Sequence, residues 1–458
     1  MSIAVIGTGY VGLVSGTCFA EMGFDVTCID KDQTKISRLK KAQIPIYEPG
    51  LKELVKKNIA ADRLSFTDNL KTGVKGAKTI FIAVGTPTNE IDGSADLSYV
   101  FAAAREIAEH IENDSVVVIK STVPLGTGRK MKEIIAKANP RLKFHTVSNP
   151  EFLREGRAVK DFLQPDRVII GVDSEKSRAA MQRLYQSMIN ENIPVIFTDI
   201  ETAELTKYAA NAFLATKIAF INEMADLCDK SGANIDDVSL GLGLDPRIGK
   251  DYLKTGPGFG GSCFPKDTLA LRKIAFDLGA QSEIVESVIA ANDKRKLAMA
   301  EKIIKANSDS GGGGVKGKTI AALGLTFKAD TDDIRASAAL TIIPELVKNG
   351  AKVKAYDPQG MNNARKVLSG DIEWCDDVYQ ALEEADSAVI ITEWQEFAEM
   401  DLAKVKSLLK KPLLVDLRNM FYPEDVKKAG LNYISLGREA VYSDARYQMS
   451  DVRKKKKL

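Results

Sequence analysis

Short apolar segments alternate with polar, glycine-containing segments along the first part of the chain. Apolar runs with the length of strands lie at 3–6, 26–29, 79–84, 115–119, 168–172 and 195–197. Between the first two runs, a helical stretch extends to Met22 and Gly23 ends it. Alternation of short strands and helices is typical of α/β domains with a parallel sheet. This part of the chain is therefore predicted to form such a domain.

The last third of the chain repeats this pattern. Strand-like runs lie at 319–323, 352–356, 387–391 and 412–415, with a helical stretch from Leu340 to Lys348. Between the two regions, Asp199 is placed to cap a long helix that reaches about Lys230, where Gly232 supplies a stop. Further helical segments continue to about Ala306. The pattern predicts an α/β protein with two Rossmann-like doubly wound parallel-sheet domains, joined by a long central helix and a helical middle region.

These elements divide the chain into four segments. We expect residues 1–198 to form the first domain, 199–306 the central helical and dimerisation region, and 307–446 the second Rossmann-like domain. The run from Ser308 to Gly314, with four successive glycines, is typical of a flexible linker. Residues 447–458 form a basic tail that we expect to be disordered.

Length and composition are those of a soluble enzyme with several domains. The chain has 458 residues, of which 45% are hydrophobic and 28% charged, and this is too long for one ordinary core. The formal net charge is +2, and Arg453–Lys457 supplies five positive charges, so the rest carries about −3. That balance gives no reason to expect a nucleic-acid or membrane partner. No apolar run approaches the ~18 residues of a membrane span, and a strand beginning at Ile3 leaves no room for a signal peptide.

Cysteine and histidine, the most versatile side chains for chemistry, are scarce. The cysteines are Cys18, Cys28, Cys228, Cys263 and Cys375, without a CxxC motif or paired spacing. Such usage is typical of reduced thiols in a cytoplasmic protein. His110 and His145 are the two histidines, so we expect neither a histidine-based triad nor a metal site. Acid–base chemistry then falls to Lys, Asp, Glu or Cys.

The segment from Ile3 to Asp30 carries a dinucleotide-binding fingerprint. A strand runs into Gly7-Thr-Gly9-Tyr-Val-Gly12, a helix follows, and the next strand ends at Asp30. The glycines allow a tight turn and close approach of a pyrophosphate to a helix N-terminus, and the acid meets the ribose hydroxyls. Because a carboxylate repels a 2′-phosphate, Asp30 favours NAD over NADP. Lys31 and Lys35 weigh against this preference, although Lys35 can also face the ribose or solvent.

Polar residues follow two further strands. Gly85-Thr86-Pro-Thr88 comes after one strand and Lys120-Ser121-Thr122-Val-Pro124 after the next. Because ligands bind beyond the carboxyl ends of parallel strands, Thr86, Ser121 and Thr122 are placed to touch cofactor or substrate. Ordinary turn and cap chemistry is an equal alternative.

Two pairs of polar residues are spaced four apart. Glu151 and Glu155 would share one face of a helical turn, where paired carboxylates can hold a water or share a proton, although spacing alone favours a solvated face. Lys207 and Asn211 lie in the predicted long helix on a stripe rich in alanine, which would let a ligand come close. The alternative is that Lys207 extends to water.

The segment Gly258–Asp267 is a candidate for covalent chemistry. Three glycines precede Cys263 and let a large ligand approach its thiol, while Lys266 and Asp267 follow closely. A nearby ammonium group favours the thiolate, which is the nucleophilic form of cysteine. A buried and unreactive thiol in a glycine-rich loop is the equal alternative on this segment alone.

The second Rossmann-like domain lacks the glycine fingerprint. Gly324-Leu-Thr-Phe-Lys328 stands in its place, so this domain is predicted to bind something other than a dinucleotide. Lys328, Arg335 and Arg418 lie at predicted strand ends or in loops, where such cations suit phosphate oxygens.

These motifs resemble those of the UDP-glucose/GDP-mannose dehydrogenase family, and most closely its bacterial members that oxidise UDP-glucose. The resemblance covers roughly Ile3 to Arg446. The segments that carry it are Gly7–Gly12, Gly85–Thr88, Lys120–Pro124, Asn149–Leu153, Lys207–Asn211, Gly258–Asp267 and Phe327–Lys328. So many motifs in one order make the resemblance specific.

The resemblance implies an enzyme that oxidises a primary alcohol to a carboxylate in two hydride transfers, using two NAD in turn. Cys263 matches the nucleophile that attacks the aldehyde to give a thiohemiacetal, and a thioester follows that water hydrolyses. Lys207 matches the lysine that stabilises the oxyanion. Asp267 and Thr122 match positions that hold water or transfer protons, and Glu151 matches a glutamate credited with acid–base work. Asn211 matches a further residue of this catalytic set.

The resemblance also implies which residues bind the two ligands. The first domain would bind NAD and the second the UDP-sugar. Cofactor contacts would be made by Gly7, Gly9, Tyr10, Val11, Gly12, Asp30, Lys35, Thr86, Thr122, Glu155 and Arg335. Substrate contacts would be made by Glu151, Lys207, Asn211, Arg247, Tyr252, Gly260, Lys328 and Arg418. Arg247 matches an arginine that reaches the sugar across a dimer interface, so a homodimer or higher homo-oligomer is expected.

Other functions are also compatible with these residues. Within the family, the alternative substrates are GDP-mannose and UDP-N-acetylhexosamines, but Ser262 replaces the histidine usual in amino-sugar enzymes and Phe264 the leucine frequent in GDP-mannose enzymes. An inactive nucleotide-sugar-binding protein is disfavoured because Cys263, Lys207 and Asp267 are intact. An NADP-linked reductase of branched hydroxy acids would need neither a loop cysteine nor a second nucleotide-type domain.

Overall fold

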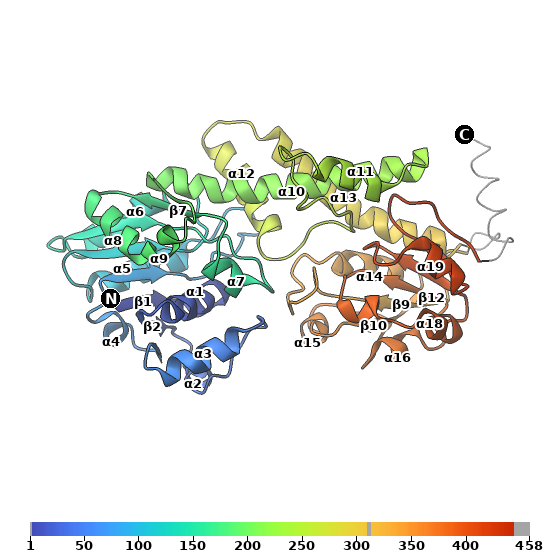
Figure 1. Ribbon diagram of the computed structural model, residues 1–458, viewed down its shortest axis with the longest axis horizontal. Helices are drawn as coiled ribbons and strands as arrows, with labels where there is room; N and C mark the ends of the chain where they lie inside the picture. Colours follow the sequence, from blue (N-terminus) through green and yellow to red (C-terminus); the bar gives the residue numbers. More distant parts are fainter. Residues whose placement is uncertain (1, 309–312, 444–458) are drawn as a thin grey trace. The chain divides into compact units, whose positions relative to one another are not determined.

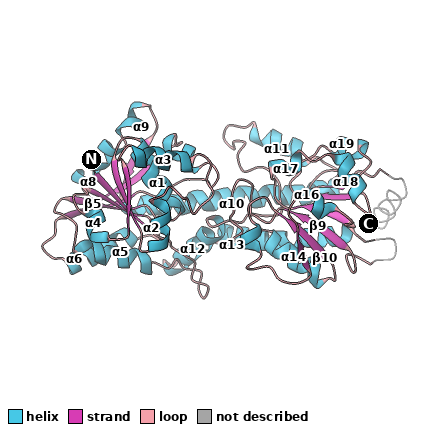
Figure 2. Cartoon of the chain, turned by 90° about the horizontal axis from the view of Figure 1, so that it is seen from below, coloured by secondary structure: helices cyan, strands magenta, loops and turns pink. Residues whose placement is uncertain are grey.

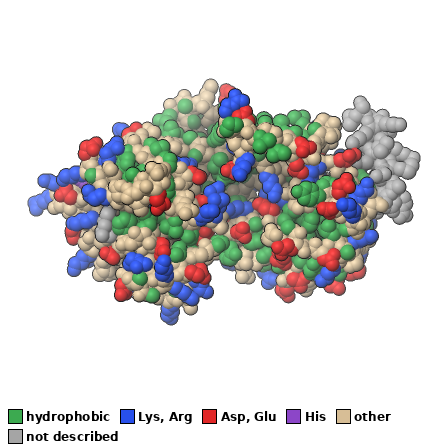
Figure 3. All heavy atoms as spheres, viewed as in Figure 1, with side chains coloured by type: hydrophobic (Ala, Val, Ile, Leu, Met, Phe, Trp, Pro, Cys, Tyr) green, Lys and Arg blue, Asp and Glu red, His purple; other side chains and the backbone are tan. Residues whose placement is uncertain are grey.

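The structure is a computed structural model that describes residues 2–308 and 313–443. The chain forms two compact units (Figure 1), of which the first comprises Met1–Asn211 and Lys266–Gln281, and the second Ala212–Pro265 and the chain from Ser282 onward. The basic tail 447–458 lies outside the described residues, as does 309–312 of the predicted linker. Over the face drawn in Figure 3, basic and acidic side chains are interspersed.

The first unit is built on an eight-stranded sheet with the strand order β3-β2-β1-β4-β5-β6-β7-β8. The strands are β1 (Ser2–Ile6), β2 (Asp25–Ile29), β3 (Leu64–Thr67), β4 (Thr79–Ile82), β5 (Ser115–Ile119), β6 (Phe144–Ser148), β7 (Val168–Val172) and β8 (Val195–Thr198). The predicted strands are confirmed, whereas β3 and β6 were not foreseen. Strand β4 ends two residues earlier than expected. The chain beyond it lies against the glycine loop, since a Cβ on Gly7 would be only 2.6 Å from the carbonyl oxygen of Ala83.

Helices cover both faces of this sheet, as Figure 2 shows. They are α1 (Tyr10–Glu21), α2 (Gln33–Leu39), α3 (Leu51–Ala60), α4 (Leu70–Val74), α5 (Ser98–Ala108), α6 (Thr127–Ala138), α7 (Ala158–Leu163), α8 (Glu175–Leu184) and α9 (Gln186–Asn190). Successive strand residues point to opposite faces. Ile3 and Val5 therefore pack in the core with α1, α3 and α8, while Ala4 and Ile6 pack with α5 and α6. This two-sided burial is the doubly wound arrangement that the apolar runs predict.

One strand pairing departs from the expected parallel sheet. Strand β7 runs antiparallel to β6, and β8 runs parallel to β7. Because β7 enters the sheet from the edge at which β6 ends, no crossover is needed between them. The connecting residues 149–167, which contain Glu151 and α7, therefore stay at the carboxyl edge of the sheet. That edge is where α/β domains bind ligands.

Four helices form the middle region. They are α10 (Ile200–Ser231), α11 (Ile235–Gly243), α12 (Phe264–Asp277) and α13 (Glu283–Ala306). The predicted cap at the start of α10 is confirmed, because Asp199 Oδ1 accepts a hydrogen bond from the Thr202 amide at 2.8 Å. Gly232 follows the helix with φ of +81°, a conformation suited to glycine at a helix end. Within the described residues, no helix is both long enough and apolar enough to cross a membrane.

The second unit contains a six-stranded, all-parallel sheet with the order β11-β10-β9-β12-β13-β14. Its strands are β9 (Thr319–Leu323), β10 (Lys352–Tyr356), β11 (Ile372–Trp374), β12 (Ser387–Ile390), β13 (Leu413–Asp416) and β14 (Asn432–Ile434). Its helices are α14 (Ala339–Lys348), α15 (Met361–Ala364), α16 (Val378–Leu382), α17 (Gln395–Ala398), α18 (Leu402–Leu408) and α19 (Pro423–Lys428). Ile320 packs with α13 and α14 on one face and Leu323 with α16 and α18 on the other. The predicted second Rossmann-like domain is confirmed.

The core of the first unit depends on Phe19, which is fully buried and lies within 6.4 Å, between ring centroids, of Phe24, Phe81, Phe162 and Tyr185. We expect Phe19→Ala to lower the free energy of unfolding of this unit by about 3–5 kcal/mol, because it leaves a cavity among aromatic rings. Urea denaturation followed by far-ultraviolet circular dichroism measures the change. Tyr99→Ala, at a tyrosine that is 58% exposed, is the matched control and should shift stability by less than about 0.5 kcal/mol.

Candidate active site

The glycine loop between β1 and α1 has the shape of a phosphate cradle. Gly7 has φ of +95°, and a Cβ on Gly12 would lie 2.0 Å from the Gly7 carbonyl oxygen, so neither position accepts a side chain. A Cβ on Gly9 would meet no protein atom within 4 Å, which leaves that side of the loop open to a ligand. No side chain caps the N-terminus of α1. Its first amide groups can therefore donate to an anion.

Asp30 lies at the end of β2 beside this loop. Its Oδ2 accepts hydrogen bonds from the amide and hydroxyl of Thr8 at 2.9 and 2.6 Å, and from Lys35 Nζ at 2.9 Å. Burial by itself would raise the pKa of Asp30, but these donors outweigh it and hold the pKa at about 2. A fixed carboxylate at this place suits ribose hydroxyls and disfavours a 2′-phosphate. Lys35, for which two orientations were open, pairs with Asp30.

The structure brings two of the three predicted strand-end residues together. Thr86 Oγ1 donates to the carbonyl oxygen of Thr122 at 3.0 Å, so the loops after β4 and β5 are joined. The hydroxyl of Ser121 instead donates to the carbonyl oxygen of Val84 at 2.6 Å. Ser121 therefore has a structural role, whereas Thr86 and Thr122 lie together at the carboxyl edge of the sheet.

Glu48 ties the glycine loop to the segment that carries Glu155, a function that the sequence gave no reason to expect. Its buried carboxylate accepts hydrogen bonds from the Tyr10 hydroxyl and from the amide of Gly156, the latter at 2.7 Å. Burial, followed by the bond to Glu48, raises the pKa of Tyr10 well above its usual value. Tyr10 is therefore a neutral hydrogen-bond donor, and the two predicted cofactor-binding segments are held in register.

Glu151 and Lys207 form a buried ion pair, with Glu151 Oε1 3.4 Å from Lys207 Nζ. Both side chains are less than a tenth exposed. The alternative placements in solvent, a solvated glutamate and a lysine that extends to water, are therefore wrong. The predicted helical turn is also wrong, because residues 149–156 form a loop and α7 begins only at Ala158. Glu151 is directed to Lys207. Because this segment is a loop, Glu151 and Glu155 do not share a helical face.

Asp267 is a second buried carboxylate that contacts α10, the helix that carries Lys207. Its side chain is 1% exposed, and its two oxygens accept hydrogen bonds from Asn211 Nδ2 at 2.6 Å and from Lys266 Nζ at 2.5 Å. The predicted i, i+4 pair of α10 is confirmed as one face, since Lys207 and Asn211 are both buried. Each member of that pair thus meets one carboxylate.

A second buried lysine, Lys120, joins the loops after β5 and β6. Its Nζ donates to Asn149 Oδ1 at 3.1 Å, and the same oxygen accepts from the Tyr185 hydroxyl at 2.6 Å. Burial lowers the pKa of Lys120 to about 8, with Glu151 acting to raise it and Lys207 to lower it further. The three charged side chains therefore influence one another in a site with little water.

Two more buried carboxylates fix the backbone around this cluster, and neither was singled out in the sequence. Glu204 accepts hydrogen bonds from the amides of Gly126 and Gly128 at 2.7 and 2.8 Å, which caps α6 directly after Thr122 and its loop. Asp161 accepts from the amide and guanidinium of Arg154, with the nearest contact at 2.7 Å. Glu204 lies three residues before Lys207, so helical spacing was the one sequence signal that could have found it.

Cys263 belongs to the second unit and directly precedes α12, a 14-residue helix. It is partly exposed, whereas the other four cysteines are buried. A helix N-terminus stabilises a thiolate beside it. The glycines before Cys263 were expected to let a ligand approach, but two of them contact protein instead: a Cβ on Gly260 would lie 2.5 Å from the Ala336 carbonyl oxygen and one on Gly261 2.8 Å from the Phe327 ring. The glycine-rich segment is therefore packed against the loop after β9.

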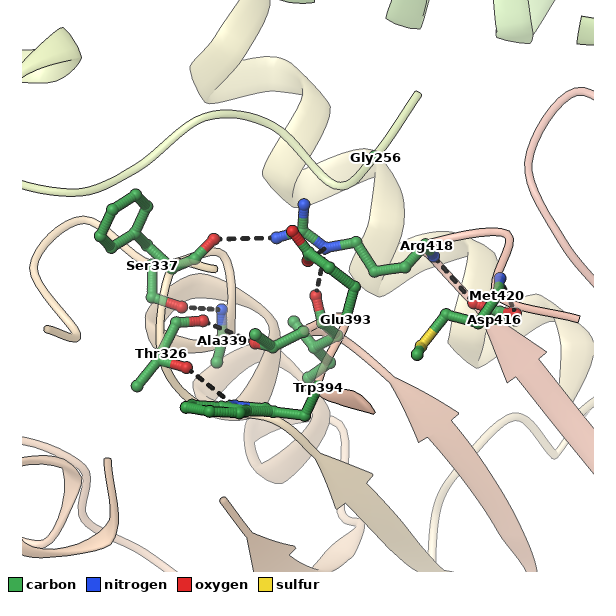
Figure 4. Close-up of polar contacts among 12 residues, drawn as sticks. Gly256, Thr326, Ser337, Ala339, Glu393, Trp394, Asp416, Arg418 and Met420 are labelled. Atoms are coloured by element: carbon green, nitrogen blue, oxygen red, sulfur yellow. Dashed lines mark hydrogen bonds and ion pairs between the residues drawn. The ribbon is translucent and has the colours of Figure 1, made fainter. Parts of the chain in front are cut away.

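Arg418 is held in the second unit at the carboxyl end of β13, as Figure 4 shows. It donates to the carbonyl oxygens of Ile391 and Phe327 at 2.7 and 2.9 Å, and it forms an ion pair with Glu393 at 3.0 Å. A side chain on Gly256 would meet its Nη1 at 3.2 Å. Glu393 was not foreseen from the sequence. A guanidinium fixed in this way is oriented before any ligand arrives.

The remaining predicted residues of the second unit are placed as follows. Lys328 lies after β9, with Nζ 5.7 Å from the centroid of Phe327. Tyr252 has φ of +64° and packs edge to face against Phe264. Arg247 and Arg335 are exposed, at 87% and 66%, and each is oriented by an aspartate two residues earlier. No group of three or more His, Cys, Asp or Glu able to hold a metal occurs among residues 2–308 and 313–443.

Models of a single protein family match most of the chain. The NAD binding domain of the UDP-glucose/GDP-mannose dehydrogenase family matches residues 1–189, its central domain 201–294 and its UDP binding domain 321–423. UDP-glucose 6-dehydrogenase of Rhizobium meliloti (strain 1021) is 55% identical over 440 residues, covering 96% of this chain and 100% of that protein. UDP-glucose 6-dehydrogenase TuaD of Bacillus subtilis (strain 168) is 50% identical, covering 96% and 94%.

A solved structure has the same fold over nearly the whole chain. The UDP-glucose dehydrogenase of the hyperthermophilic archaeon Pyrobaculum islandicum superposes with a TM-score of 0.87 at 36% sequence identity. The match covers 96% of this chain and 98% of that one. The two-sheet architecture described above is thus that of a known group of dehydrogenases.

The Glu204 carboxyl gives a pH-dependent prediction. Burial raises its pKa to about 7 despite the two amide donors, so the folded state favours the protonated form, and its contribution to stability is lost as pH rises from about 4.5 to 7. Relative to Glu204→Gln, the parent should lose up to about 3 kcal/mol of unfolding free energy across that window. Urea denaturation at pH 5 and pH 8 measures this change. An equal change in unfolding free energy between the two pH values for parent and variant would contradict the prediction. Glu175→Gln, at a side chain that is 92% exposed, is the control.

Proposed function

The chain belongs to the UDP-glucose/GDP-mannose dehydrogenase family, and from this premise we propose that it oxidises UDP-glucose to UDP-glucuronate with two NAD and one water. It is an NAD-dependent nucleotide-sugar dehydrogenase. The observation that carries the finer proposal is the buried cluster of Lys207, Glu151, Asn211 and Asp267, with the Cys263 thiol at the start of the helix that supplies Asp267. Oxidation of an alcohol beyond the aldehyde needs such a set of nucleophile, oxyanion donor and base.

The first unit would hold NAD through groups that are already oriented. The open side of Gly9 and the amides of α1 suit the pyrophosphate, Asp30 suits the adenine ribose, and Thr86 and Thr122 suit the nicotinamide half. Tyr10, Val11, Lys35, Glu155 and Arg335 complete the proposed set of cofactor contacts. When bound, NAD accepts the hydride from the sugar C6.

The steps carried out by the protein's own residues follow from this arrangement. Loss of hydride and a proton converts the C6 alcohol to an aldehyde, and the Cys263 thiolate then adds to its carbonyl carbon to give a thiohemiacetal. Lys207, a buried ammonium, stabilises the negative oxygen formed in that addition. Loss of the second hydride leaves a thioester on Cys263, and attack by water breaks the C–S bond to release the carboxylate and the thiol.

Water activation is assigned to the carboxylates. Asp267 is oriented by Asn211, and Glu151 by Lys207, so either can position a water and accept its proton. Thr122 lies after β5 and supplies a hydroxyl for proton transfer. The dry surroundings of the cluster strengthen each of these interactions.

The second unit would bind the UDP half of the substrate. Lys328 and Arg418 suit the phosphate oxygens, while Tyr252 and the close-packed backbone at Gly260 shape the site around the sugar. UDP-N-acetylhexosamines and GDP-mannose are the alternative substrates, and Ser262 and Phe264 favour UDP-glucose. We also place the reaction in the cytoplasm, where a nucleophilic thiol stays reduced.

We further propose that the active form is a homodimer or a higher homo-oligomer. Phe213, Phe220 and Leu227 recur every seven residues on α10 and are 66%, 46% and 57% exposed. Leu240 of α11 and Leu244, which directly follows that helix, add further exposed apolar surface and are 62% and 74% exposed. Exposed apolar surface of this kind is typical of subunit interfaces. Arg247, which is exposed and oriented, would reach the sugar in the neighbouring subunit.

The substrate is tested by NADH formation with UDP-glucose, GDP-mannose or UDP-GlcNAc, and with NADP in place of NAD. We expect two NADH per UDP-glucose and a loss of at least about 1,000-fold in kcat for Cys263→Ala, because the nucleophile is removed. Turnover of another sugar only would overturn the proposed substrate. Binding of NAD and UDP without turnover of any sugar would instead indicate a nucleotide-sugar-binding protein.

The shared site is tested by mixing two defective variants, Cys263→Ala and Arg247→Ala. If Arg247 acts across the interface, a mixed dimer contains one site with both residues intact. About a quarter of parental activity should therefore return after subunit exchange. Activity that stays at the sum of the separate variants would place both residues in one subunit's site.

A further inference from the structure

Residues 255–261, which lead to Cys263, lack regular secondary structure, yet most of them are buried. Buried backbone amides and carbonyls need hydrogen-bond partners. At Gly256 and Phe259, the partners come from polar side chains of the helices α10 and α13. All of these residues belong to the second unit.

Asn292 on α13 satisfies both polar groups of one backbone residue. Its Oδ1 accepts from the Phe259 amide at 2.7 Å, and its Nδ2 donates to the Phe259 carbonyl oxygen at 3.1 Å. A paired contact of this kind fixes the position and the rotation of the backbone at Phe259. The Asn292 side chain is 6% exposed, so water does not compete for these bonds.

Asn222 and Arg295 do the same at Gly256. Asn222 Oδ1 accepts from the Gly256 amide at 2.8 Å and from the Thr255 hydroxyl at 3.0 Å. Arg295 Nε donates to the Gly256 carbonyl oxygen at 3.1 Å, and its guanidinium is paired with Asp226. Both side chains are about 5% exposed or less. The segment is thus fixed at two backbone residues three apart.

Helix α13 also fixes the loop after β9, against which Gly260 packs. Lys296, next to Arg295, donates to the carbonyl oxygen of Ala336 at 2.8 Å. The amide of Gly261 donates to the carbonyl oxygen of Arg335 at 2.7 Å. Since Gly260 packs against the Ala336 carbonyl, the bond from Lys296 ties α13 to the backbone that this glycine contacts.

We propose that Asn222, Asn292, Arg295 and Lys296 are positioning residues for the nucleophile, which hold residues 255–261 so that Cys263 is presented at the start of α12. The inference rests on the proposed function for the role of Cys263. None of the four side chains needs to touch substrate. Their effect is carried by the backbone, and a misplacement of the thiol by about 1 Å can cost on the order of 100-fold in rate.

The test compares Asn222→Leu, which is similar in size but cannot accept hydrogen bonds, with Asn222→Asp, which keeps the acceptor for both donors. We expect Asn222→Leu to lower kcat roughly 10- to 100-fold with little change in the KM for NAD, and Asn222→Asp to recover most of the loss. Met299→Ala, at a buried residue of α13 in the core of the second sheet, is the control for lost stability. It should retain kcat near the parental value at a matched decrease in melting temperature.

A second readout does not depend on turnover. Burial raises the pKa of the other four cysteines, so iodoacetamide should alkylate Cys263 selectively, as mass spectrometry of the peptide can verify. We expect Asn222→Leu and Asn292→Ala to change the alkylation rate of Cys263 several-fold, and Met299→Ala to leave it unchanged. Lys296→Met provides a milder variant in case the asparagine variants do not fold.

The outcomes separate the two proposals. Alkylation rates that follow only the melting temperature, or an Asn222→Asp variant as defective as Asn222→Leu, would overturn the positioning role. A parent protein that turns over no sugar, but whose Cys263 alkylation still responds to Asn222→Leu, would overturn the proposed function and leave the positioning role in place.

Discussion

The buried ion pair between Lys207 and Glu151 is the contact on which the site of the first unit depends. Charges removed from water are costly unless partners compensate them, and a lone buried ammonium would lose its proton or pull in water. Here the lysine keeps a carboxylate at 3.4 Å, and the neighbouring Asp267 is satisfied by Asn211 and Lys266. The site can therefore stay dry and charged, which is the condition under which an ammonium stabilises an oxyanion strongly.

Both units position their loops by side-chain bonds to backbone rather than by regular secondary structure. Glu204 binds two amides after Thr122, Asp161 binds Arg154 after Glu151, and Asn292 binds Phe259 before Cys263. Asp357 does the same in the second unit, where it accepts from the amides of Leu325 and Thr326. Loops at the carboxyl edge of a sheet can carry function only if their buried polar groups are satisfied. Polar side chains from distant helices supply those partners.

The features that could be predicted from the sequence are local ones. The glycine loop, Asp30 at the end of its strand and the Asp199 cap each follow from a few adjacent residues and the backbone geometry they require. The expectation for Glu151 and Glu155 failed because spacing alone does not include competing partners. Glu151 pairs with Lys207, which is 56 residues away, and this segment forms a loop at the edge shared by β6 and β7. No periodicity in residues 149–156 contains that information.

The two sheets and the dinucleotide-type loop could be predicted from the sequence alone, and Cys263 could be singled out as a candidate, because short apolar runs and glycines at fixed spacing are properties of short stretches. The folded chain was needed to establish that β7 runs antiparallel to β6, that Lys207 is buried, and that Glu48, Glu204 and Asn292 bind backbone amides of the site loops. Each of these depends on which distant groups remain to be hydrogen-bonded or neutralised once water is excluded. That requirement arises from burial, which exists only in the folded chain.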